Sequence, residues 1–300
     1  MAHIKRPTLA DLDLSTGKRT RLHRLLYTFG PANGTLLFLP IDQGLEHGPR
    51  DFFPNPPAKD PEFQLRLAKE GNFSGIVFQI GIAEKYMPKY AGVVPLVLKL
   101  NGKTEIPSDK APISPLMATV EDAVRLGADA VGYTLYVGTP GQERDFAQYL
   151  RVREDAERLG MPLIVWAYPR GAAVEAKGGR DSFYAVDYAA RTASELGADM
   201  IKVNFPQPAR QDGVPDAYRQ EFSPQEAITA VARSANRSLL LVSGGERAGD
   251  EAMLEKARHS MEAGATGFIF GRNVFQRGQS ESLRLVERLK EILAKYPPAA

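Results

Sequence analysis

The chain of 300 residues contains no cysteine. It therefore forms no disulfides and offers neither thiolate metal ligands nor a cysteine nucleophile. Histidine is also scarce, with four residues: His3, His23, His47 and His259. Only His47 falls where we expect chemistry, because the others lie in the first 34 residues or on a predicted surface helix. A catalytic zinc held by three histidines is therefore not available, and we predict no metal site.

An excess of one charge sign is missing as well. The 38 Lys and Arg residues face 36 Asp and Glu residues, which leaves a net charge of +2. This balance gives no field that would hold a nucleic-acid backbone or an anionic membrane. No apolar run approaches the ~18 residues of a membrane span, and the charged amino terminus lacks the apolar stretch of a signal peptide. We expect a cytoplasmic, soluble protein with no nucleic-acid or membrane partner.

Eight short apolar runs follow one another from residue 35 onward. They are rich in Val, Ile, Leu and Phe and do not alternate with polar residues, which is typical of strands buried on both faces of a parallel sheet. The runs are 36–41, 75–80, 95–100, 129–136, 162–168, 199–205, 238–243 and 267–271.

The segments between these runs carry apolar residues at helical spacing. We predict helices within 60–71, 114–128, 141–160, 181–198, 223–235, 250–265 and 280–296, and a weaker one at 82–90, which contains Pro88. Residues 1–34 are polar and weakly periodic, and we interpret them as an N-terminal extension with one helix over 19–27.

A similar tripeptide precedes or opens several of the predicted strands, and we call it the Gly-Ala-Asp repeat. Gly127-Ala128-Asp129, Gly197-Ala198-Asp199 and Gly264-Ala265-Thr266 each end a helix and open a strand. They are 70 and 67 residues apart, which is in each case about two units of the ~31-residue repeat of a TIM barrel. We therefore predict an α/β fold, a single-domain (β/α)8 TIM barrel over 35–300, with the extension 1–34 packed on it. An open doubly wound sheet is the rival, although it would more often carry a glycine-rich turn after its first strand.

In a TIM barrel, the carboxyl ends of the strands and the loops that follow them face the active site. Lys202 lies inside the apolar run DMIKVNF at such a position, and a lysine is almost never buried without a partner or a purpose. Desolvation and nearby cations lower the pKa of a lysine and make a nucleophilic amine available. One interpretation is a Schiff base with a carbonyl substrate; the other is an ion pair with a carboxylate such as Asp42.

Glycines follow the seventh and eighth runs, as Ser243-Gly244-Gly245 and Gly271-Arg272. Loops at these two places in TIM barrels often bind phosphate through backbone N–H groups. Glycine lets the backbone approach an anion closely, and Arg272 adds a charged donor. We predict a phosphate site here, although a tight turn alone would also explain the glycine pair.

Side chains of the fifth and first runs complete the candidates. Alternation points Trp166 and Tyr168 toward the same side of the strand, where they form part of the core or place a phenol proton donor at the mouth. Arg170 suits a second phosphate. Asp42 is a general base or an ion-pair partner of a lysine, and His47 is a candidate for substrate contact.

Five segments, IDQGLEHGP, YPRG, IKVNF, SGG and GRNVFQR, together resemble the archaeal-type class I fructose-bisphosphate aldolases, the DhnA-like family. The resemblance runs from about residue 35 to 277 in the right order. It implies a metal-free, Schiff-base aldolase that forms a large homo-oligomer and needs no cofactor. It also implies reversible cleavage of fructose 1,6-bisphosphate to dihydroxyacetone phosphate and glyceraldehyde 3-phosphate, a step of glycolysis and gluconeogenesis.

The resemblance also assigns roles. Lys202 would form the Schiff base, Tyr168 would transfer protons, Asp42 would orient the lysine and the intermediate, and Trp166 would line the site. The expected substrate- and phosphate-binding residues are Gln43, His47, Arg170, Asn204, Ser243, Gly244, Gly245, Gly271 and Arg272. Of these, His47 and Arg170 would lie toward the second phosphate.

Other functions stay open at this stage. The family also contains enzymes that act on amino-hexulosonate precursors and on a phosphorylated signalling dione, so a related aldolase, transaldolase or thiolase is an alternative. A non-catalytic sugar-phosphate-binding barrel would not need a buried Lys202 facing Tyr168, and an isomerase would use carboxylate bases. The long segments 174–183 and 205–222 are expected to cover the mouth and to influence which aldehyde is accepted.

The histidine count generates a first prediction. Aldolase activity should survive exhaustive treatment with EDTA, because the chain cannot assemble a three-histidine zinc site. Turnover of fructose 1,6-bisphosphate is measured before and after chelation, with and without added Zn²⁺. Activity that disappears on chelation and returns with zinc would contradict the argument.

Overall fold

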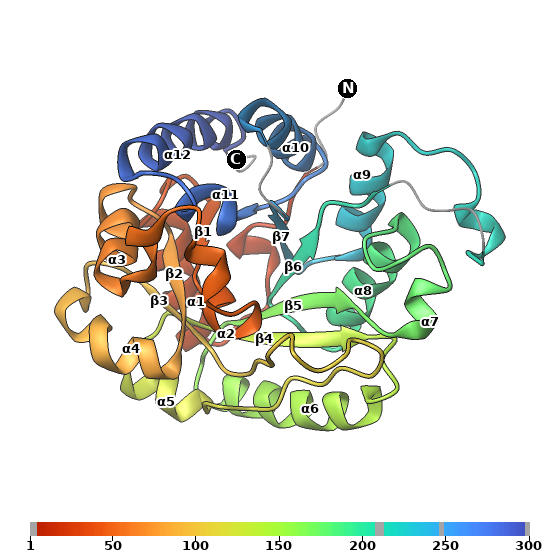
Figure 1. Cartoon of the computed structure of the whole chain (residues 1–300), viewed down its shortest axis with the longest axis horizontal. Coiled ribbons are helices and arrows are strands. Elements are labelled where there is room, and N and C mark those ends of the chain that lie inside the picture. Colours follow the sequence, from red (N-terminus) through yellow and green to blue (C-terminus); the bar gives the residue numbers. More distant parts are fainter. Residues whose placement is uncertain (1–4, 208–212, 246–248, 298–300) are drawn as a thin grey trace.

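The computed structural model describes residues 5–207, 213–245 and 249–297. Eight parallel strands close into a barrel in the order of the chain, and β1 pairs with β8 (Figure 1). The strands are β1 Leu36–Pro40, β2 Gly75–Gln79, β3 Leu96–Lys99, β4 Ala130–Val137, β5 Leu163–Pro169, β6 Met200–Asn204, β7 Leu239–Ser243 and β8 Gly267–Ile269. The predicted (β/α)8 barrel is confirmed, and the pairing of the first and last strands rules out the open doubly wound sheet.

Helices form a ring around this barrel (Figure 1). The longer ones are α3 Pro61–Glu70, α4 Ile80–Tyr86, α5 Val120–Arg125, α6 Gln142–Arg158, α8 Phe183–Glu195, α9 Pro224–Ser234, α10 Asp250–Glu262 and α12 Gln279–Ala294, and a further helix, α1 Thr16–Tyr27, covers one end of the barrel. Three single turns, α2 Gln43–Glu46, α7 Ala172–Glu175 and α11 Arg272–Phe275, follow β1, β5 and β8. Short 3-10 turns cover Leu9–Asp11, Pro49–Phe52, Pro56–Lys59, Met87–Tyr90 and Asp216–Tyr218. None of the described helices is long and apolar enough to cross a membrane.

The helix predicted within 114–128 is wrong in its first half. Helix α5 begins only at Val120, because Thr119 and Asp122 form a capping box: the Thr119 hydroxyl accepts from the Asp122 N–H at 3.1 Å, and the Asp122 carboxylate accepts from the Thr119 N–H at 2.9 Å. Before the cap the chain is extended, and the Met117 N–H donates to the Leu100 carbonyl at 2.8 Å.

Helix α1 closes the amino end of the barrel. Its residues Leu22 and Leu25 are fully buried and belong to one apolar cluster with Leu36, Val97 and other side chains from inside the barrel. The division of the chain into an extension, residues 1–34, that packs on a single barrel domain, residues 35–300, stays a prediction.

Two aspartates of the Gly-Ala-Asp repeat form ion pairs with this helix. The Lys18 amine lies 2.9 Å from the Asp199 carboxylate, and Arg24 Nε lies 2.8 Å from that of Asp129. Asp199 comes directly before β6 and Asp129 directly before β4. The Gly-Ala-Asp repeat therefore puts carboxylates at the end of the barrel that α1 covers.

Candidate active site

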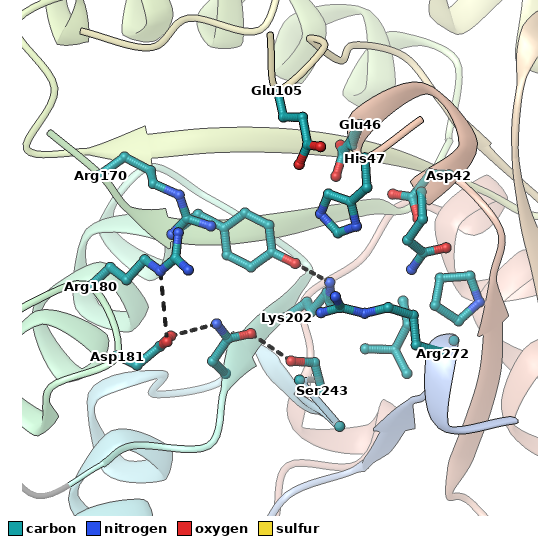
Figure 2. Close-up of a pocket in the computed structure, with 18 of the residues that line it drawn as sticks. Asp42, Glu46, His47, Glu105, Arg170, Arg180, Asp181, Lys202, Ser243 and Arg272 are labelled. Carbon is teal, nitrogen blue, oxygen red and sulfur yellow. Dashed lines mark hydrogen bonds and ion pairs between the residues drawn. The ribbon is translucent and has the colours of Figure 1, made fainter. Parts of the chain in front are cut away.

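A polar cavity of about 290 Å³ opens at the carboxyl ends of the strands (Figure 2). Every residue that the sequence nominated for the site lines it, with the exception of Trp166. Trp166 is fully buried and lies one layer deeper, where its ring packs beneath lysine side chains. Trp166 was expected to line the cavity. Its ring instead forms the floor of the site, the layer beneath the lysine side chains.

Lys202 projects from β6 into this cavity and is 5% exposed. Its amine donates a hydrogen bond to the Tyr168 hydroxyl (Figure 2). Burial lowers the pKa of Lys202 to about 8, and the positive charges of Lys99 and Arg272 act in the same direction, against Asp42 and Glu46. About a tenth of the amine is then uncharged at pH 7, which makes it a usable nucleophile.

The ion pair considered for Lys202 goes instead to a second lysine. Lys99, on β3, has no exposed surface, and its amine lies 2.9 Å from the Glu46 carboxylate and 3.5 Å from that of Asp42. It also donates to the Asn101 carbonyl at 3.2 Å. Burial alone would lower the pKa of Lys99, but the two carboxylates raise it above its ordinary value. Lys99 is thus held as a cation.

Glu46 is the main residue that the sequence analysis missed. It lies on α2 one turn after Asp42, so the two carboxylates of the IDQGLEHGP segment face the same lysine. Burial would raise the pKa of Glu46, but Lys99 lowers it overall; the pKa of Asp42 is raised by burial and by Glu46. The i, i+4 spacing in the motif was the signal that could have revealed this pair.

Tyr168 stands beside Lys202 and shares the barrel interior with Trp166, as strand alternation predicts. Burial, together with the negative charges of Glu46 and Asp42, raises its pKa well above 10. The phenol therefore holds its proton at neutral pH. The Arg170 guanidinium lies 5.0 Å from the centre of its ring, and Arg170 also lines the cavity (Figure 2).

The loops after β7 and β8 meet on the other side of the cavity. The Ser243 hydroxyl donates to the Asn204 side chain at 2.6 Å, and Arg272 lines the cavity nearby (Figure 2). A Cβ on Gly244 would lie 2.6 Å from the Asn273 side chain, and one on Gly271 would lie 2.8 Å from the Pro40 carbonyl. Glycine is required at Gly271 because a Cβ would collide with backbone, whereas a Cβ at Gly244 would displace the Asn273 side chain. Two glycine turns beside an arginine form a site suited to a small anion.

Cations from three loops surround the mouth, each paired with a carboxylate. Arg50 lies 2.7 Å from Glu105, Lys103 lies 2.7 Å from Asp109, and Arg180 lies 3.9 Å from Asp181. None of these six residues follows a strand directly, so the sequence did not single them out. Arg180 and Asp181 belong to the long segment 174–183, so this segment does reach the mouth (Figure 2). For the segment 205–222, residues 208–212 lie outside the described residues.

His47 and Gln43 lie where the sequence placed them, on the β1 side of the cavity. The His47 ring nitrogen Nδ1 lies 2.8 Å from the Asp51 carboxylate, which fixes the ring. In the described ranges, no three His, Asp or Glu side chains lie close enough together to hold a metal ion.

Fold and site together define a class of protein. A closed (β/α)8 barrel with a buried, low-pKa lysine and a phenol at its mouth, beside glycine turns suited to an anion, is the arrangement of an aldolase that works through an amine. A model of the DeoC/LacD family of aldolases matches residues 36–277. The chain belongs to this family.

Similar proteins agree with this placement. The chain is 41% identical over 261 residues to a fructose-bisphosphate aldolase class 1 of Thermoproteus tenax, covering 87% of this chain and 90% of the relative. It is 32% identical over 260 residues to a 2-amino-3,7-dideoxy-D-threo-hept-6-ulosonate synthase of Halobacterium salinarum, covering 87% and 86%. A solved archaeal fructose-1,6-bisphosphate aldolase, whose catalytic Lys is covalently bound to the carbinolamine intermediate of the substrate, has a TM-score of 0.77 and 38% identity, covering 91% of this chain and 99% of that one.

The lowered pKa of Lys202 generates a second prediction. Because only the uncharged amine reacts, the rate of reductive methylation at Lys202 should rise about tenfold per pH unit below pH 8 and level off above it. An ordinary lysine would keep rising toward its pKa of about 10.4.

Brief exposure to formaldehyde and cyanoborohydride between pH 6 and 10, followed by peptide mass spectrometry, measures this profile. An added unstructured lysine peptide provides the reference. A Lys202 profile that follows the reference peptide would contradict the lowered pKa.

Proposed function

We propose that the protein is a class I aldolase that cleaves fructose 1,6-bisphosphate reversibly to dihydroxyacetone phosphate and glyceraldehyde 3-phosphate through an imine on Lys202. The observation that carries this proposal is the buried Lys202 amine, with a pKa near 8, in hydrogen-bond contact with Tyr168. The relatives named as class 1 aldolases, and the covalent lysine intermediate of the solved neighbour, support the same chemistry.

The first half of the reaction forms the imine. The lone pair of the Lys202 nitrogen attacks the C2 carbonyl of the open-chain sugar and, after proton transfer from nitrogen to oxygen, gives a carbinolamine. Tyr168 then donates its proton to the C2 hydroxyl, which leaves as water, so the nitrogen becomes a positively charged iminium and Tyr168 a phenolate. The new cation beside Tyr168 favours the phenolate, which burial alone disfavours.

The second half breaks the carbon–carbon bond. The phenolate of Tyr168 takes the proton of the C4 hydroxyl, the C3–C4 electron pair moves into the iminium, and glyceraldehyde 3-phosphate leaves with an enamine remaining on Lys202. Tyr168 returns its proton to C3, and water then hydrolyses the iminium to dihydroxyacetone phosphate and the free amine, while the proton released in hydrolysis restores the Tyr168 phenol. The iminium serves as the electron sink that a Lewis-acidic metal provides in other enzymes.

The two sides of the cavity suit the two phosphates. Ser243, Gly244, Gly245, Gly271 and Arg272 would hold the phosphate of dihydroxyacetone phosphate through backbone N–H groups and one guanidinium. Arg170 and His47 would lie toward the other phosphate, and Gln43 and Asn204 toward the sugar hydroxyls. Asp42 would orient the intermediate from the Lys99 side.

The cations at the mouth favour this substrate over the alternatives. A related Schiff-base enzyme acting on another phosphorylated ketose or dione would share Lys202 and the glycine turns. A second phosphate, however, gives Arg170 and Arg180 an anion in place of Asp109 and Asp181, the carboxylates they meet now. A kcat/KM for fructose 1-phosphate as high as that for the bisphosphate would favour an alternative substrate.

We also propose that the protein is a cytoplasmic homo-oligomer. The resemblance to the archaeal-type aldolases supports this, as do large apolar side chains on the outer helices that remain exposed, among them Leu150 on α6 and Tyr188 on α8. Light scattering after size-exclusion chromatography measures the subunit number, and a monomer would contradict the proposal.

Trapping tests the function directly. Borohydride added together with dihydroxyacetone phosphate should reduce the imine and leave a single adduct, which peptide mass spectrometry should locate on Lys202. The Lys202→Met variant serves as the control and should take up none. A missing adduct in the parent, or one on another lysine, would overturn the proposed chemistry.

Tyr168→Phe should separate imine formation from bond cleavage. The ring and its packing remain, but the group that takes the C4 proton is lost, so kcat should fall by ~10²–10⁴. Borohydride should still trap dihydroxyacetone phosphate on Lys202 in this variant, more slowly than in the parent. Turnover and trapped fraction are measured on the same sample; a kcat within a few-fold of the parent would remove Tyr168 from the reaction.

A further inference from the structure

Two buried lysines share one aromatic floor. The Lys99 amine lies 5.1 Å from the centre of the Trp166 ring and the Lys202 amine lies 5.4 Å from it. Gly132, on β4, makes room for this stack, because a Cβ there would lie 2.5 Å from the Trp166 ring and 3.1 Å from the Lys99 side chain. Both amines are therefore buried over the same ring, and packing alone does not decide which of them becomes the nucleophile.

The polar partners of the two amines differ. Lys99 is paired with the carboxylates of Glu46 and Asp42, at 2.9 and 3.5 Å. Lys202 donates to the neutral hydroxyl of Tyr168 and, among the described residues, forms no ion pair with a carboxylate. Lys99 therefore has charged partners, and Lys202 has an uncharged one.

Charged groups face Lys202 from several elements of the barrel. They are Asp42 after β1, Glu46 on α2, Lys99 on β3 and Arg272 on α11, and the uncharged but titratable Tyr168 lies on β5. Tyr136 on β4, next to Tyr168 across the sheet, is a further titratable group of the lining, whereas β7 contributes the uncharged Ser243. The negative charges in this set are the same two carboxylates that pair with Lys99.

We propose that Lys99 is a positioning residue that selects Lys202 as the nucleophile by holding Glu46 and Asp42 in ion pairs on its own side of Trp166. The proposal rests on the proposed function for the identity of the nucleophile, but its subject is the resting amine. With Lys99 present, the two carboxylates are balanced by a permanent cation. Without it, Lys202 is the buried amine left in the cluster to balance them.

Removal of Lys99 should therefore change a measurable property of Lys202 that the loss of a purely structural residue would leave unchanged. In Lys99→Met the charge of Glu46 and Asp42 is no longer compensated, so protonation of Lys202 becomes more favourable. The pH midpoint of methylation at Lys202 should rise by about one unit or more, and kcat/KM at pH 7 should fall at least about tenfold. Activity should recover as the pH is raised toward the new midpoint.

Three further variants sharpen this test. Lys99→Arg keeps the cation and should keep the midpoint. Adding Glu46→Gln to Lys99→Met removes one uncompensated charge and should bring the midpoint back toward that of the parent. Lys18→Met is the matched control, because it deletes another buried lysine, 2.9 Å from Asp199 at the opposite end of the barrel, and should leave the midpoint unchanged.

The methylation midpoint of each folded variant decides the outcome. A folded Lys99→Met protein with the midpoint of the parent would overturn the proposal. If Lys99→Met does not fold, the single variant Glu46→Gln decides, because loss of that carboxylate should lower the midpoint of Lys202, and an unchanged midpoint would contradict the proposal. Since methylation needs no substrate, a shifted midpoint without a dihydroxyacetone phosphate adduct in the parent would refute the proposed function and leave the inference standing.

Discussion

Lys202 loses most of its contact with water when the eight strands close around it, and water is what ordinarily holds a lysine in its charged form. The barrel replaces that water with the Trp166 ring below and the Tyr168 hydroxyl beside the amine. A usable fraction of uncharged, nucleophilic amine at neutral pH, about a tenth at pH 7, follows from this exchange. The glycine turns and the cations at the mouth bring the substrate carbonyl to an amine that the fold has already prepared.

The two lysines affect the stability of the fold in opposite ways as the pH changes. The pKa of Lys202 is lower in the folded chain than in the unfolded one, so its burial costs stability below about pH 8, and this cost is relieved as the pH rises toward 10.4. The pKa of Lys99 is raised, so its ion pairs stabilise the fold below pH 10.4, and that contribution is lost as the pH rises through the folded pKa. At neutral pH, the ion pairs of Lys99 therefore offset part of the folding stability that is lost by burying Lys202.

The sequence allowed the strands to be predicted because a strand buried on both faces has a continuous apolar pattern, and each observed strand ends within about two residues of its predicted run. Once the strands were known, the barrel rule led to Lys202, Tyr168 and the glycine turns. The rule could not reveal Glu46, which reaches Lys99 only through the single turn of α2, or the cations at the mouth, which come from long loops. Single turns and loops lack the periodicity from which a position in space is predicted.

The pairing of Glu46 and Asp42 with Lys99, and not with Lys202, also affects the reaction itself. A carboxylate paired directly with Lys202 would stabilise its protonated, unreactive form, whereas the iminium formed later has to keep its positive charge in order to accept the C3–C4 electron pair. Lys99 cancels part of the field of Glu46 and Asp42 at this nitrogen, and it does so for the ammonium and the iminium alike because both carry their positive charge at the same place. Interactions that are stronger for the charged intermediate than for the resting state are those that accelerate a reaction. Lys99 therefore keeps the ammonium from being stabilised too strongly, while the part of the carboxylate field that it leaves uncancelled still favours the iminium over the uncharged amine.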